Sequence, residues 1–136
     1  MDLAPARWSA RPQSLEPLLV VLIAAHSFLV GAALLFLTDG VLRFAGWDQI
    51  GPFFFPRQAG IFHLVVAVGY LIEYFRYRGV AFLLVTKGVA VCFLLAMILA
   101  GPAPWAVPFS GALDALMAVS VGLVHRRSER GTRKAE

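Results

Sequence analysis

Four long apolar stretches dominate this chain of 136 residues and limit what it can fold into. They cover residues 18–37, 56–76, 80–99 and 105–124. A helix needs about 20 mainly apolar residues to cross the ~30 Å hydrocarbon core of a bilayer. The composition agrees, because 60% of the residues are hydrophobic and only 15% are charged, more apolar surface than a soluble domain of this size could bury. The sequence therefore predicts an all-α fold, a four-transmembrane-helix antiparallel bundle forming a single integral membrane domain over residues 1–136.

The first stretch, residues 18–37, carries no formal charge and follows Pro17. Proline suits the first turn of a helix, where its missing N–H would have no partner anyway. A cleaved signal peptide is the alternative, but its apolar region is only about 7–15 residues long. We therefore expect a retained first helix, preceded by an irregular polar segment over residues 1–17 in which Trp8 could rest at the membrane surface.

Residues 38–55 form a connector rich in glycine and aromatic residues. Trp47 and the phenylalanines at 53–55 match the belt of aromatic rings found at membrane–water interfaces. Residues 41–44 could form a short helix in the membrane plane.

The basic residues are distributed unevenly between the two sides of the predicted bundle. With four spans, both termini and the turn between the second and third spans share one side. The basic residues on that side are Arg7, Arg11, Arg76, Arg78, Arg126, Arg127, Arg130, Arg133 and Lys134. The other side has only Arg43 and Arg57. By the positive-inside rule, we expect a cytoplasmic membrane location, both termini in the cytoplasm and a basic cytoplasmic tail over residues 125–136.

The second span carries a polar stripe at helical spacing, which should lie on one face of the helix. Its members are His63, Val66, Tyr70, Glu73 and Tyr77. The opposite face carries Ile61, Leu64, Val68, Leu71 and Ile72, which can meet lipid. The stripe should therefore point inward, either as hydrogen-bonding glue between helices or as a surface that contacts a ligand, proton or substrate.

Lys87 and Asp114 lie within the third and fourth spans, where an isolated charge is strongly disfavoured. At 1.5 Å per residue they lie about 12 Å and about 16 Å from the cytoplasmic boundary, so a lysine side chain could join them. Lys87 could instead reach Glu73. A Lys87–Asp114 pair could lock two helices together, gate protons or bind a polar head group. Small residues near Asp114 also allow close helix packing; they are Gly111, Ala115, Ala118 and Gly122.

His26 and His63 lie at similar predicted depths on adjacent antiparallel helices. They could ligate a b-type haem, although a single histidine in a helix is more often a hydrogen-bonding residue. Arg57, just after Pro56, could anchor the helix at the interface or hold an anionic group of a lipid or quinone-like ligand.

Several classes of chemistry have no support in the sequence. Cys92 is the only cysteine, which excludes an intrachain disulfide, a CxxC redox pair and a cysteine zinc site. The sequence contains no phosphate-binding glycine loop and no HExxH zinc motif, and we cannot assemble a serine–histidine–aspartate site from it. We therefore expect no catalytic residues and no metal ligands apart from the haem alternative. The net charge of +4 fits anionic lipid head groups better than nucleic acid.

The Arg57-Gln58-Ala59-Gly60 start of the second span and the region around Glu73 resemble DoxX-like small membrane proteins. That family consists of four-helix bundles with scattered buried polar residues, and some members are tied to quinone-linked redox complexes. The resemblance covers the second to fourth spans and implies the same fold. Other four-span families fit less well, because this chain lacks the first-span glutamate of small multidrug exporters and the paired cysteines of vitamin K reductase-like proteins.

Three functional hypotheses follow from these features. The leading one is a non-catalytic subunit, assembly partner or lipid-binding module, with membrane lipids, a membrane-protein partner or a second copy of the chain as its contacts. The second is a redox-associated protein that binds quinone or haem between the first two spans. The third is a small proton-coupled transporter that uses Glu73, Lys87 and Asp114.

Overall fold

The computed structural model describes residues 15–36, 38–48 and 51–133, and these contain helices and no strands. The helices are α1 (Leu15–Leu35), α2 (Asp39–Phe44), α3 (Phe54–Ile72), the π-helical turn η1 (Glu73–Tyr77), α4 (Ala81–Ala100) and α5 (Ala106–Arg133). Four segments are long and apolar enough to cross a membrane: Leu15–Leu35, Phe54–Tyr77, Ala81–Ala100 and Ala106–Ser128. The all-α prediction is confirmed, and the chain is a multi-pass membrane protein.

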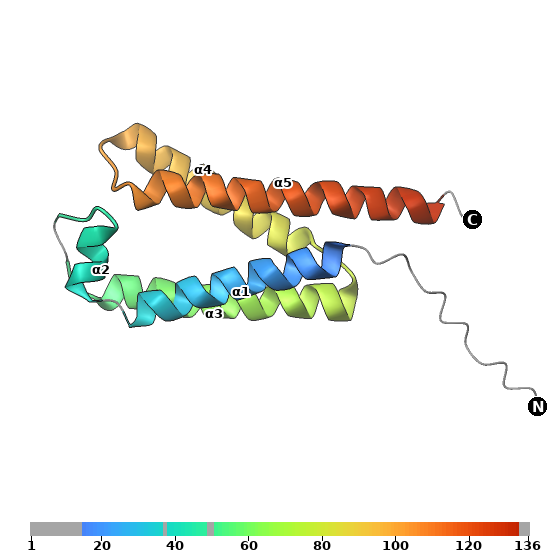
Figure 1. The fold of residues 1–136 in the computed structure, drawn as a ribbon, viewed down its shortest axis with the longest axis horizontal. Helices are drawn as coiled ribbons and strands as arrows, with labels where there is room; N and C mark the ends of the chain where they lie inside the picture. The colour runs from blue at the N-terminus through green and yellow to red at the C-terminus, as the bar shows by residue number, and fades with distance from the viewer. Residues whose placement is uncertain (1–14, 37, 49–50, 134–136) are drawn as a thin grey trace, which may run out of the picture.

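The long helices form two antiparallel pairs, α1 with α3 and α4 with α5 (Figure 1). The pairs approach each other where α3 turns into α4 and spread apart toward α2 (Figure 1). Arg78 adopts a left-handed conformation with φ 57° and ends the π-helical turn. Gly79 follows it, and the chain then reverses into α4 within a few residues.

The buried core lies in the half of the bundle nearest this reversal. All four long helices contribute to it, together with η1 and the residue that precedes α4. Its members are Val20, Ile23, Ala24, Tyr70, Tyr74, Val80, Leu83 and Val121. The core therefore joins the two helix pairs at the end where α3 turns into α4. At the other end, the connector between α1 and α3 lies between the pairs.

That connector docks onto the turn between α4 and α5. The Trp105 indole Nε1 donates a hydrogen bond to the carbonyl oxygen of Phe44 at 2.6 Å. The two rings also meet edge to face, with centroids 5.6 Å apart. Gly46 has φ +96°, and a Cβ there would lie 3.0 Å from the backbone nitrogen of Trp105, so this close approach requires glycine. The short helix considered around residues 41–44 is present as α2, and it bridges the two pairs (Figure 1).

Two glycines bring α1 and α3 into direct backbone contact. A Cβ on Gly31 would lie 2.8 Å from the carbonyl oxygen of Gly60, and a Cβ on Gly60 would lie 2.8 Å from that of Gly31. Small residues at helix interfaces permit this closeness in membranes. The approach places α1 against one side of α3. Leu64 and Leu71, which we predicted to meet lipid, are therefore half-buried beside α1.

Two predicted helix boundaries and the predicted inward position of Tyr77 need correction. Helix α1 begins at Leu15, so residues 15–17 are helical, whereas Trp8, Arg7 and Arg11 lie outside the described residues. Helix α5 continues to Arg133, so most of the basic tail is helical. Tyr77 is 74% exposed and does not belong to the inward face. A π-helical turn has i→i+5 bonds and a different side-chain register from an α-helix, and Tyr74 takes the buried position instead.

Candidate functional site

Lys87 and Asp114 form a buried ion pair between α4 and α5. The Lys87 Nζ lies 2.5 Å from Asp114 Oδ1, and the two side chains are 4% and 13% exposed. The two residues face each other because α4 and α5 run antiparallel and pack along their length. Of the two partners that the sequence allowed for Lys87, the structure pairs it with Asp114. An ion pair at this depth avoids the high cost of an isolated charge in hydrocarbon.

The ion pair forms part of the wall of a cavity at the meeting point of all four long helices, which we call the central cavity. Its volume is about 200 Å³. The lining residues are Ser27, Phe62, His63, Val66, Tyr70, Thr86, Lys87, Ala90 and Asp114. The cavity thus combines His63, Tyr70, Lys87 and Asp114, four of the residues selected from the sequence.

Tyr70 and Thr86 form one side of the central cavity. Tyr70 is 1% exposed, and its ring packs on Phe82 of α4 with centroids 5.7 Å apart. The Thr86 hydroxyl donates to the carbonyl oxygen of Phe82 at 2.7 Å. This side of the cavity is therefore held in place from both α3 and α4.

Ser27 and His26 of α1 carry the buried polar atoms that lack a protein partner. The Oγ of Ser27 and the Nδ1 of His26 are both buried without a hydrogen bond among the described residues. Ser27 lines the central cavity. Ser27 could not be predicted as a cavity residue, because a serine inside an apolar helix gives no signal of its own.

Glu73 does not reach Lys87; it caps the start of α4. Its carboxylate accepts hydrogen bonds from the backbone N–H groups of Phe82 at 2.8 Å and Leu83 at 3.4 Å. These N–H groups lie in the first turn of α4, where no intrahelical partner exists. A carboxylate there also complements the positive end of the helix dipole.

We expect Glu73→Ala to lower the free energy of unfolding by about 1 kcal/mol, since loss of a helix cap costs about 0.5–2 kcal/mol. The measurement is reversible unfolding in mixed micelles of a mild detergent and dodecyl sulfate. Asp48→Ala, at an exposed position of the connector, is the control and should leave the value unchanged. Equal effects of the two substitutions would contradict the capping role.

A polar contact between Glu16 and His125 joins α1 to α5. The Nδ1 of His125 lies 2.9 Å from Oε1 of Glu16, whose side chain is 7% exposed. Helical spacing puts Ser110 and His125 on the same face of α5 as Asp114. His125 is half-buried, but Ser110 is exposed. Glu16 was not predicted as a contact residue, because residues 1–17 were expected to lie outside the helix, whereas α1 begins at Leu15.

Arg57 does not line the central cavity. Arg57 is exposed, and its guanidinium lies over the Phe53 ring, 5.5 Å from the centroid, which suits an interfacial anchor. A Cβ on Gly31 would also lie 3.1 Å from the Cβ of His63. The helices α1 and α3 therefore pack closely beside His63, and a haem between His26 and His63 stays a prediction. No cluster of three or more metal-binding side chains occurs within residues 15–36, 38–48 and 51–133.

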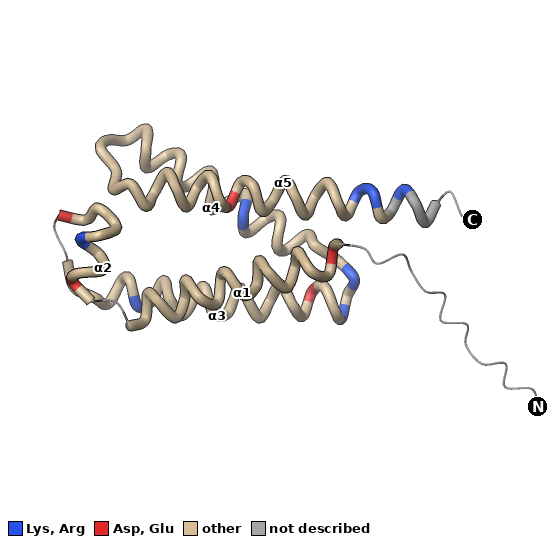
Figure 2. Tube along the Cα trace, in the orientation of Figure 1, with Lys and Arg blue, Asp and Glu red and all other residues tan. Residues whose placement is uncertain are grey.

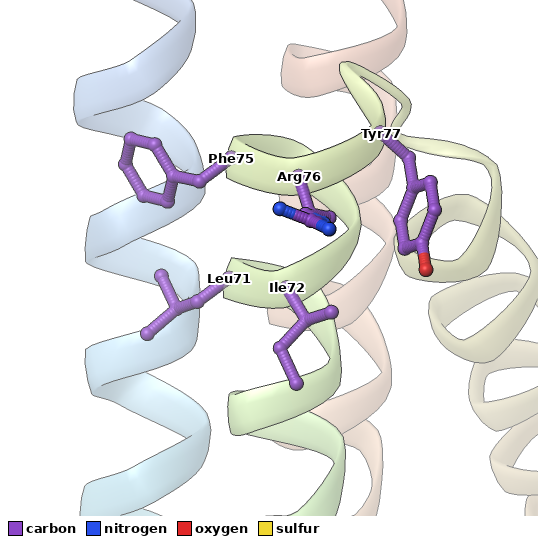
Figure 3. A pocket seen from close by; sticks show the side chains of 5 residues that line it. All are labelled: Leu71, Ile72, Phe75, Arg76 and Tyr77. Atoms are coloured by element: carbon purple, nitrogen blue, oxygen red, sulfur yellow. The ribbon is translucent and has the colours of Figure 1, made fainter.

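A larger hollow of about 520 Å³ lies at the end of α3. It is lined by Leu71, Ile72, Phe75, Arg76 and Tyr77, which project from one helix and its π-helical turn (Figure 3). Arg76 is the one charged side chain in its lining, and no second helix supplies a polar group to it. This surface has the composition of a lipid-facing wall near the basic end of the bundle, so the central cavity is the better candidate site.

No family model, curated protein or solved structure matches this chain.

Proposed function

We propose that this protein is a non-catalytic component of the cytoplasmic membrane, with both ends in the cytoplasm, whose deep polar residues lock its helices together. The buried Lys87–Asp114 pair is the observation that carries the proposal. Here the lysine and the carboxylate neutralise each other across α4 and α5.

The other buried polar contacts support a structural role. Glu16 and His125 join α1 to α5, and Glu73 joins the end of α3 to the start of α4. Together with the ion pair, these contacts connect all four long helices. Hydrogen bonds of this kind between membrane helices are worth about 0.6–2 kcal/mol each.

The charge distribution supports the proposed orientation. Arginines gather at the α3–α4 turn and along the end of α5, at the end of the bundle where α1 also begins (Figure 2). Positive residues are enriched on the cytoplasmic side of membrane proteins, and they attract anionic lipid head groups there.

The outer surfaces of α4 and α5 leave room for lipid or for a partner helix. Only 11% of each of these spans is buried inside the bundle. Large apolar side chains on them are exposed, including Val89, Phe93 and Leu116. The role of a subunit, assembly partner or lipid-binding module fits these surfaces.

Thiol labelling separates this proposal from a proton-coupled transporter, which needs a water path to the ion pair. Ala90 lines the central cavity, and Cys92 is the only native cysteine, so Ala90→Cys in a Cys92→Ser background reports on that path. We expect no reaction with a charged thiol reagent in native membranes. The exposed connector position Gly51→Cys should react and serves as the control. Rapid labelling of Ala90→Cys would instead favour the transporter.

A further inference from the structure

Ser27 presents an unsatisfied hydroxyl to the central cavity. The residue is 1% exposed, and its Oγ has no hydrogen-bond partner among the described residues. A buried polar group left without a partner is costly, and native structures rarely leave one unpaired. A bound molecule that offers an oxygen atom in the cavity would satisfy it.

The charges around the cavity favour an uncharged occupant. Lys87 and Asp114 cancel each other, so an ion that entered would lose its hydration without meeting a net opposite charge. The Lys87 ammonium can still donate hydrogen bonds to a ligand, because it has three N–H donors and the contact with Asp114 uses one of them. The Ser27 hydroxyl and the His63 ring add further polar atoms to the same wall.

Another part of the lining is apolar and borders lipid. Phe62, Val66 and Ala90 line the cavity from α3 and α4, and Phe62 is 59% exposed on the bundle surface. Helix α4 moves away from α3 beyond their connecting turn (Figure 1). Because Phe62 lines the cavity and is also exposed on the bundle surface, a hydrocarbon tail can leave the cavity sideways past Phe62 and Ala90, which belong to α3 and α4.

We propose that the central cavity binds the uncharged, oxygen-bearing head group of an amphiphile dissolved in the membrane, with its hydrocarbon tail between α3 and α4. The cavity volume of about 200 Å³ is below the roughly 300–1,000 Å³ of sites that enclose a whole drug-sized ligand. It suits a head group alone. The inference goes beyond the helix-locking role and does not depend on it.

Native mass spectrometry of the full chain in mild detergent tests the binding. The probes are 1-monooleoylglycerol with a hydroxyl head, decylbenzoquinone with a carbonyl head, and oleate with a charged head. We expect one molecule of a neutral probe per chain and at least tenfold less oleate. The neutral probe that is retained identifies a hydroxyl or a carbonyl ligand. Equal retention of oleate, or retention of neither neutral probe, would overturn the proposal.

Two substitutions in the cavity make the test specific. Ser27→Ala removes one hydrogen bond and should weaken retention about fivefold to tenfold. Ala90→Phe should abolish retention, because its larger side chain would fill part of the cavity that Ala90 lines. Ser110→Ala, at an exposed position on α5, is the matched control and should bind like the wild type.

If Ala90→Phe does not fold, the Ser27→Ala variant alone tests the binding site. Ser27→Ala should fold, because removal of one hydroxyl hardly changes the shape of the side chain. Binding by Ser27→Ala that equals the wild type would refute the site. Neither substitution removes a charge of the ion pair, so failure here leaves the helix-locking role to be judged by its own measurements.

Discussion

Asp114→Asn is expected to lower the free energy of unfolding by about 3–5 kcal/mol, the cost of breaking a buried ion pair by removing one charge. The substitution leaves the Lys87 ammonium, 4% exposed, without its counter-charge inside the bundle. Adding Lys87→Met should recover part of the loss, because the unpaired charge is then gone. The measurement is equilibrium unfolding of both variants and the wild type in mixed micelles.

Asp39→Asn is the matched control, since Asp39 is an exposed aspartate in α2. Its effect should stay within about 0.5 kcal/mol, as for most surface substitutions. If the double variant is no more stable than Asp114→Asn alone, the two charges are not coupled and the proposed lock between α4 and α5 is wrong.

Gly31→Ala is expected to destabilise the bundle by about 1–3 kcal/mol through overpacking. The new Cβ would lie 2.8 Å from the carbonyl oxygen of Gly60 and 2.9 Å from Leu64 Cδ2. A side chain could move aside, but the backbone of α3 cannot do so without separating the two helices. The same unfolding assay measures the effect.

Gly88→Ala in α4 is the control, because Gly88 is a helical glycine that makes no close contact. A Cβ there meets nothing within 4 Å, so the variant should gain about 0.5–1 kcal/mol from the lower entropy of its unfolded chain. Equal effects at Gly31 and Gly88 would show that the direct α1–α3 contact does not form.

The features that follow from residue type and depth could be predicted from the sequence. Apolar length alone indicates four spans. Lys87 and Asp114 could be paired because the cost of a charge in hydrocarbon demands a partner at similar height. Tyr70 and His63 were placed inward by helical periodicity, and both line the central cavity.

The features that depend on which helices touch could not be predicted. The Gly31–Gly60 contact places α1 on the side of α3 that looked lipid-facing, and nothing in either helix alone specifies that choice. The Glu16–His125 contact joins the two ends of the chain and requires the first helix to begin earlier than expected. The π-helical turn that turns Tyr77 outward leaves no clear mark in the pattern.

Cysteine accessibility in intact cells tests the central claim most directly, namely that four helices cross the membrane with both ends in the cytoplasm. In a Cys92→Ser background, Gly51→Cys lies in the connector between α1 and α3, and Tyr77→Cys lies at the exposed α3–α4 turn. We predict that a membrane-impermeant maleimide labels Gly51→Cys from outside and Tyr77→Cys only after the cells are opened. Labelling of Tyr77→Cys in intact cells, or of both positions from the same side, would contradict the account.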